Sequence, residues 1–166
     1  ASKEGKVEIE VSGAMIHYEE DGSKESPVVL LWNGASCTLR MWDFVVKELK
    51  DEYRFIRFDV RGTGSSIYQD PDSNLFSLDQ YNEDANRILK QLQIDKVIVW
   101  SMAWGSRAAI AYCSKNVDRV NNAVLHDASI AKADPTAQKE GAKAAVEKQI
   151  SQGIKKFEKP ANYNLN

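Results

Sequence analysis

The chain has 166 residues, of which 43% are hydrophobic, and its 22 basic side chains nearly balance 24 acidic ones. This composition predicts a soluble globular core and shows no excess of positive charge that would favour a nucleic acid as partner. The longest apolar runs, at 28–32 and 97–100, are far shorter than the about 20 residues that a membrane-spanning helix needs. We therefore expect no nucleic-acid partner and no membrane partner.

The N-terminus and the cysteines indicate the cellular location and the state of the thiols only in part. The first residue is Ala1 rather than Met, so we expect the Lys-rich start to be a cleaved product or a remnant of a fusion. No apolar signal segment follows, which favours the cytoplasm and leaves export open. Cys37 and Cys113 lack the number and spacing of a disulfide framework or a metal site, so we expect two reduced thiols and no metal.

The first elements expected along the chain are a β-hairpin and a strand-helix unit. Apolar and charged residues alternate over 7–11, Ser-Gly-Ala follows at 12–14, and 15–19 resumes the extended pattern. Residues 28–32 form a short apolar run that is typical of a strand buried on both faces. Apolar residues then recur at helical spacing over 42–49.

Strands and helices continue to alternate through the rest of the chain. A helix is expected over 78–92, behind a capping box formed by Ser77 and Gln80, and a helix of small residues surrounds 108–112. Three further strands are expected, at 53–59, 97–100 and 120–125. This alternation predicts an α/β fold with a mostly parallel sheet, helices on both faces, and ligand chemistry at the carboxyl ends of the strands.

The pentapeptide Ser101-Met102-Ala103-Trp104-Gly105 joins an expected strand to an expected helix. Its frame matches the sharp turn that lifts a nucleophile above a parallel sheet, usually written G-x-S-x-G. Small residues at its first and last positions let the backbone cross itself closely. Ala103 therefore places a methyl group at the position of the nucleophile.

Three motifs in order and spacing resemble the α/β-hydrolase superfamily. They are Trp32-Asn33-Gly34-Ala35, the stretch Phe58-Asp59-Val60-Arg61-Gly62-Thr63-Gly64-Ser65-Ser66, and the elbow with its flanks, Val99 to Ser106. The elbow is similar to that of the proline iminopeptidase branch, which uses serine. The resemblance covers about 7–128 and implies an oxyanion loop in which Asn33 replaces His. We expect Asp59 and Arg61 in the second motif to be structural.

The resemblance also implies the members of the site. The backbone amides of Ala35 and Trp104 would form the oxyanion hole beside the nucleophile position, Ala103. Asn33, Gly34 and Met102 are expected to line the pocket, and Asp127 is a candidate for the acid of the triad. His17 is expected on a strand surface and His126 at the pocket rim, so neither is expected to be the general base. No cofactor and no metal is implied.

The resemblance leaves three functions open. The leading hypothesis is a hydrolase of a carboxylic ester or amide that uses a nucleophile-His-acid mechanism and is inactivated because Ala103 replaces serine. The alternative enzyme is a haloalkane dehalogenase or epoxide hydrolase with an aspartate nucleophile. The third hypothesis is a non-catalytic ligand-binding or interaction protein on the same fold, in which Ala103 is native.

Residues 1–130 are expected to be the N-terminal part of the hydrolase core, and 131–166 the start of a cap over the pocket. Val146, Ile150, Ile154 and Phe157 recur at helical spacing in that second segment, a pattern that an ordinary surface helix also shows. We expect a second polypeptide to supply the last core strands, the acid and the histidine. The other expected partner is a small-molecule substrate.

Overall fold

The computed structural model describes residues 2–9, 14–67 and 77–128, together with residues 136, 140, 144, 147 and 151. The chain divides into two compact units, Ala1–Ala128 and Ser129–Tyr163. The five described residues of the second unit are helical and exposed. Most of the expected cap at 131–166, including its apolar positions from Val146 to Phe157, lies outside the described residues.

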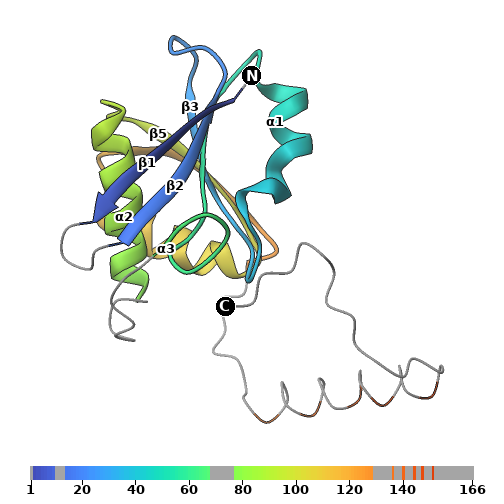
Figure 1. Ribbon diagram of the computed structural model, residues 1–166. Coiled ribbons are helices and arrows are strands. Elements are labelled where there is room, and N and C mark those ends of the chain that lie inside the picture. The colour runs from blue at the N-terminus through green and yellow to red at the C-terminus, as the bar shows by residue number, and fades with distance from the viewer. Residues whose placement is uncertain are drawn as a thin grey trace. The chain divides into compact units, whose positions relative to one another are not determined.

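The first unit is built on a six-stranded sheet with the order β1-β2-β4-β3-β5-β6 (Figure 1). Strands β1 and β2 pair antiparallel and form the expected hairpin, and β2 also pairs antiparallel with β4. The pairs β4-β3, β3-β5 and β5-β6 are all parallel, so the prediction of a mostly parallel sheet is confirmed. The strands are β1 (Lys3–Ile9), β2 (Ala14–Asp21), β3 (Val28–Trp32), β4 (Arg54–Phe58), β5 (Val97–Met102) and β6 (Val120–His126).

Helices cover both faces of this sheet, as expected. A 3-10 helix, η1 (Leu39–Trp42), leads into α1 (Asp43–Leu49) on one face, while α2 (Leu78–Gln91) and α3 (Trp104–Lys115) pack on the other (Figure 1). The crossover from β3 to β4 moves toward the hairpin, whereas the crossovers from β4 to β5 and from β5 to β6 move away from it. Because such connections are right-handed, α1 must lie opposite α2 and α3.

The larger apolar core lies under α2 and α3. Trp32 is fully buried there, with its ring 5.3 Å from that of Phe58 and 5.4 Å from that of Tyr112. Ile88 and Leu89 of α2 are also fully buried in this cluster. Each such side chain contributes about 1.5–3 kcal/mol by leaving water, which fixes α2 and α3 on the sheet and thereby the loops at its carboxyl edge.

The start of α2 confirms one half of the predicted capping box. The Ser77 hydroxyl accepts a hydrogen bond from the Gln80 amide at 3.2 Å. The Gln80 side chain, however, donates to Asp84 at 3.0 Å rather than reaching back toward the cap. The glutamine thus supports a buried carboxylate one turn farther along α2.

Strand β6 lies at the edge of the sheet. Along the part of the chain that the structure describes, β6 pairs only with β5, and six of its seven residues are exposed. Val124 is 48% exposed and Leu125 40% exposed. No helix among the described residues is long and apolar enough to cross a membrane.

Candidate active site

The expected elbow forms at the carboxyl end of β5. Strand β5 ends at Met102, α3 begins at Trp104, and Ala103 between them has φ 50° and ψ −119°. This left-handed conformation is costly for a residue with a Cβ and persists only where the surroundings enforce it. Two residues on, an added Cβ at Gly105 would lie 2.2 Å from the carbonyl oxygen of Asn33. Helix α3 therefore starts directly against the end of β3.

Two serines under the elbow hold it to the end of β6. Ser101 and Ser106 are fully buried, and their hydroxyl oxygens are 2.9 Å apart. The Ser106 hydroxyl donates to the carbonyl of His126 at 3.2 Å, and the Ala103 amide donates to the same carbonyl at 3.0 Å. Ser101 thus has a hydrogen-bonding role in addition to the steric role expected from its size.

Asp127 follows directly after the His126 carbonyl that receives these bonds. It has φ 52° and is exposed at the carboxyl end of β6. The side chain of His126 is exposed as well. The structure therefore brings the backbone before Asp127 to the elbow, at the edge of the sheet where the triad acid was expected.

The loop after β3 contains Ala35, whose amide was expected to be an oxyanion donor beside that of Trp104. Within this loop the Cys37 amide donates to the carbonyl of Gly34 at 3.2 Å, and Ser36 has φ 58°. Within the described parts of the chain, the amides of Ala35 and Trp104 donate to no protein acceptor. Two backbone donors are thus unused on the two loops that flank position 103.

A pocket of about 180 Å3 opens between these loops. Ala35 and Trp104 both line it, as does Tyr81 of α2, whose ring lies 5.7 Å from that of Trp104. Burial raises the pKa of the Tyr81 hydroxyl, against an opposite effect of the Arg61 charge, so the hydroxyl is protonated at neutral pH. The other lining residues are Gly34, Ser36, Cys37, Val60, Arg61, Gly62 and Thr63.

The other two residues expected in the pocket lie away from its lining. Asn33 is 1% exposed; its side-chain amide donates to the Phe58 carbonyl at 2.8 Å and accepts from the Trp42 indole at 2.9 Å. Its polar atoms are therefore used to join β3, β4 and η1. Met102 packs beside the apolar cluster on the α1 face. Of the three residues expected here, Gly34 is the one that borders the pocket.

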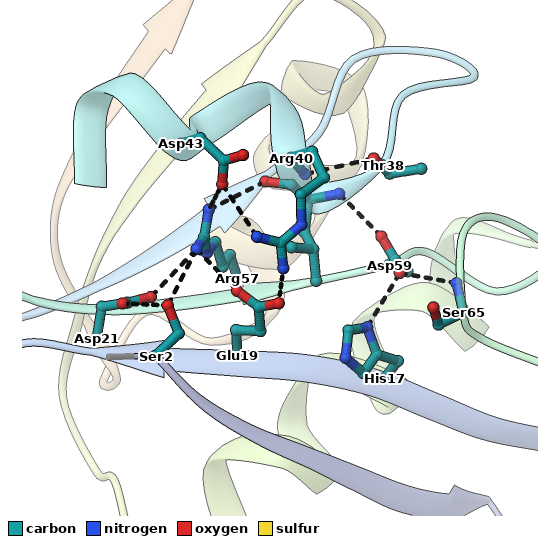
Figure 2. A network of polar contacts seen from close by, with 11 residues as sticks. Ser2, His17, Glu19, Asp21, Thr38, Arg40, Asp43, Arg57, Asp59 and Ser65 are labelled. Carbon is teal, nitrogen blue, oxygen red and sulfur yellow. Dashed lines mark hydrogen bonds and ion pairs between the residues drawn. The ribbon is translucent and has the colours of Figure 1, made fainter. Parts of the chain in front are cut away.

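The loop after β4 has the structural role that was predicted for it. Arg61 and Asp84 form a buried bidentate pair with N–O distances of 2.9 and 2.7 Å. The Asp59 carboxylate accepts from the Leu39 amide at 2.8 Å and from the Ser65 amide at 2.9 Å (Figure 2). These charges are held by the fold and leave no free group for catalysis.

The prediction for His17 was wrong. Its side chain is buried, and Nδ1 lies 3.1 Å from Oδ2 of Asp59. His17 was expected on a strand surface of the hairpin, whereas β2 lies inside the sheet between β1 and β4. Seven of its eight residues are buried, so both faces of the strand are covered.

Sequence reasoning missed Tyr81 and Cys37 as lining residues of the pocket. Tyr81 falls within the helix expected over 78–92, and it packs against the core. The order of elements contained one signal for Tyr81. A helix that connects two parallel strands runs antiparallel to them, so it begins at their carboxyl edge. The first turn of α2 therefore lies at the carboxyl edge of the strands, where pockets form. Cys37 is free and half-buried.

The described residues contain no group of three or more His, Cys, Asp or Glu side chains that could hold a metal ion.

A family model described as alpha/beta hydrolase fold matches residues 27–148. Human epoxide hydrolase 4 is 32% identical over 109 residues, which are 64% of this chain and 30% of that protein. Proline iminopeptidase of Lactobacillus acidophilus is 28% identical over 117 residues, 68% of this chain and 40% of that protein.

A hydrolase from Pseudomonas aeruginosa PA01 has a similar solved structure. Its TM-score is 0.72 at 26% sequence identity, and the match covers 92% of this chain and 57% of that one. This chain thus spans well under two thirds of the length of the curated relatives it matches.

Proposed function

Because the chain belongs to the alpha/beta hydrolase fold family, we propose that its pocket binds the substrate of a nucleophile-dependent hydrolase, with position 103 as the site of the nucleophile. One observation carries this proposal: two unpaired amides, of Ala35 and Trp104, flank a strained turn that lifts residue 103. Backbone N–H groups that have no acceptor and lie beside a reacting atom can donate to the negative oxygen of a tetrahedral intermediate and stabilise it.

The leading chemistry is hydrolysis of a carboxylic ester or amide. A serine at 103 would attack the carbonyl carbon, and the carbonyl oxygen would take the charge and accept from both amides. A histidine would take the serine proton and pass it to the leaving group, oriented by an acid, for which Asp127 is the candidate in this chain. Ala103 has no nucleophilic atom, so the chain as it stands would bind substrate without forming a covalent bond.

Epoxide opening is the second candidate, and the names of the relatives favour it. Proteins named epoxide hydrolase in Caenorhabditis elegans, Xenopus tropicalis and human are 25–32% identical to this chain. In that case the carboxylate of an aspartate at 103 would attack a ring carbon and form an ester, while the ring carbon–oxygen bond breaks and the released alkoxide takes a proton from water. Water would then attack the ester carbonyl and release the diol and the aspartate. The oxyanion of this second step would use the same two amides, and a haloalkane would react by the same attack with loss of halide. The geometry around Ala103 serves both chemistries.

Position 103 can be tested without a general base. A thiolate attacks activated esters unaided, and a carboxylate can open an epoxide, so Ala103→Cys with 4-nitrophenyl acetate and Ala103→Asp with styrene oxide should each trap a covalent adduct. Mass spectrometry of peptides locates it, and the unmodified chain controls for reaction at Cys37 and Cys113. An acyl adduct at 103 supports ester chemistry, and an alkyl adduct there supports epoxide chemistry. Folded variants without an adduct at 103 would leave a non-catalytic ligand-binding protein as the function.

We also propose that a second polypeptide completes the sheet and supplies the histidine, with 131–166 as the start of the cap. The exposed β6 edge supports this proposal, as does an apolar groove of about 170 Å3 beside it, lined by Leu49, Trp100 and Val124 among others. Exposed strand edges with apolar neighbours favour pairing with another strand. A polypeptide that co-purifies and separates only in denaturant is the expected result. A stable folded monomer of this chain alone would contradict it.

A further inference from the structure

The carboxylate of Asp59 connects three segments of the chain that are distant in sequence. Oδ1 accepts from the Leu39 amide of η1, and Oδ2 accepts from the Ser65 amide and contacts Nδ1 of His17 (Figure 2). Asp59 is 2% exposed, so these bonds are shielded from water. Hydrogen bonds to a buried ionised group are roughly twice as strong as neutral ones.

The chain makes room for this carboxylate at Gly64. A Cβ at Gly64 would lie 2.2 Å from Oδ2 of Asp59, and the glycine has φ 52°. The β4 loop therefore wraps around the carboxylate so closely that its backbone amide at Ser65 can reach it. This close approach indicates a carboxylate whose position is set on all sides.

The segment held by Asp59 comes directly after the oxyanion loop. Leu39 is four residues beyond Ala35, and its carbonyl accepts from Nη1 of Arg57 at 3.5 Å. Arg57 is held in turn by Glu19 at 2.7 Å and Asp43 at 2.5 Å (Figure 2). Arg57 lies in β4 and Asp59 directly follows its last residue, so the end of this strand fixes both the amide and the carbonyl of Leu39.

The other end of the oxyanion loop is fixed to the same region. Asn33 donates to the Phe58 carbonyl and accepts from Trp42, the last residue of η1. Between Asn33 and Leu39 the loop makes one backbone turn, from Cys37 to Gly34. The position of the Ala35 amide thus depends on how firmly Asn33 and Leu39 are held.

We propose that Asp59 is a positioning residue that sets the Ala35 amide for the reaction at position 103, with His17 holding the carboxylate in place. The inference rests on the proposed function for its catalytic consequence, but its structural half can be tested independently. Asparagine at 59 would keep one acceptor oxygen and turn an N–H2 group toward donors, so the Leu39 and Ser65 bonds could not both persist. The loop would then open more often.

Cys37 reports loop opening directly, because it lies within the loop and is half-buried. We expect Asp59→Asn to raise the rate of Cys37 modification by 4,4′-dithiodipyridine by about tenfold, the factor that loss of roughly one buried hydrogen bond allows. Cys113 on α3 serves as the internal reference and should change less than about twofold. Equal increases at both thiols would indicate a general loss of stability and overturn the proposal, as would an unchanged Cys37 rate.

His17 gives a milder variant if Asp59→Asn folds poorly. His17→Leu removes a donor to Asp59 and should raise the Cys37 rate by a smaller factor, whereas His17→Asn retains a side-chain N–H and should restore the original rate. Glu20→Gln is the matched control, because it breaks a buried ion pair with Arg54 at the opposite end of β4 without touching Asp59. It should leave the ratio of the Cys37 and Cys113 rates unchanged. A similar rise of that ratio in Glu20→Gln would contradict a specific role for Asp59.

The catalytic half is read in the Ala103→Cys background with 4-nitrophenyl acetate. Asp59→Asn should lower the maximal acylation rate by about tenfold at an unchanged half-saturating ester concentration, because a misplaced donor weakens transition-state binding selectively. An unchanged maximal rate would overturn this half. If the Cys37 result holds but no acylation occurs at 103 in either protein, the proposed function fails while the positional role of Asp59 stands.

Discussion

The loops after β4 and β5 lie at the same edge of the sheet but differ in their hydrogen bonding. The polar groups of the first loop are paired, whereas a backbone amide of the second is unpaired. In the β4 loop Asp59 and Arg61 are buried and bonded to fixed partners. At the β5 elbow the Trp104 amide is unpaired, as is the amide of Ala35, and both residues line the pocket. Ala103 adds a strained backbone to that second region.

This difference distinguishes the residues that stabilise the fold, in the β4 loop, from the residues available for binding, at the elbow. Pairing a buried polar group stabilises the fold and also removes that group from any role in binding. An unpaired donor or a strained turn costs stability and is retained where it serves a function. Changes in the β4 loop should therefore destabilise the fold strongly, while changes at the elbow should affect stability less, or even improve it.

The largest loss is expected from the buried ion pair of the β4 loop. Asp84→Asn should destabilise the chain by about 3–5 kcal/mol, because the buried Arg61 keeps its charge and loses the bidentate carboxylate of Asp84. Urea unfolding measures the change. Asp79→Asn is the control, since its ion pair with Lys115 is exposed and should contribute almost nothing. Equal losses of stability in the two variants would contradict a stabilising role for the buried ion pair of the β4 loop.

A smaller loss is expected from overcrowding under the elbow. Gly105→Ala should cost about 3 kcal/mol, because its Cβ would meet the backbone carbonyls of Asn33 and Trp32, which cannot rotate away. Gly34→Ala is the matched control: its Cβ would lie 3.7 Å from the Met102 carbonyl, an ordinary contact. Thermal unfolding of both variants checks the difference. A Gly105→Ala variant as stable as Gly34→Ala would contradict the close approach of α3 and β3.

Much of this framework was predictable from the sequence, because its signals are local. The elbow, the order of strands and helices and the cap at Ser77 all follow from short patterns. The burial of His17 could not be predicted, since it depends on β4 pairing with β2 across more than 30 residues. The same holds for Asn33, whose motif position suggested a pocket residue. Its partners Phe58 and Trp42 come from separate elements.

A glycine substitution at the elbow should stabilise the chain, in contrast to the two losses above. Ala103→Gly should stabilise the chain by about 1 kcal/mol, because glycine adopts φ 50° without strain. Ala111→Gly provides the control within α3, because Ala111 is only partly buried and the same change there should destabilise by a similar amount. Urea unfolding under identical conditions gives both values. Destabilisation by Ala103→Gly would show that residue 103 is not strained.

The central claim is that the Ala35 and Trp104 amides serve one ligand while the paired amides of Leu39 and Ser65 serve the fold. Nuclear magnetic resonance titration of the 15N-labelled chain with phenylphosphonate, whose oxygens mimic an oxyanion, tests this most directly. The amide signals of Ala35 and Trp104 should move together and give one dissociation constant, while those of Leu39 and Ser65 stay in place. Movement of Leu39 and Ser65 alone, or of none of the four, would contradict the account.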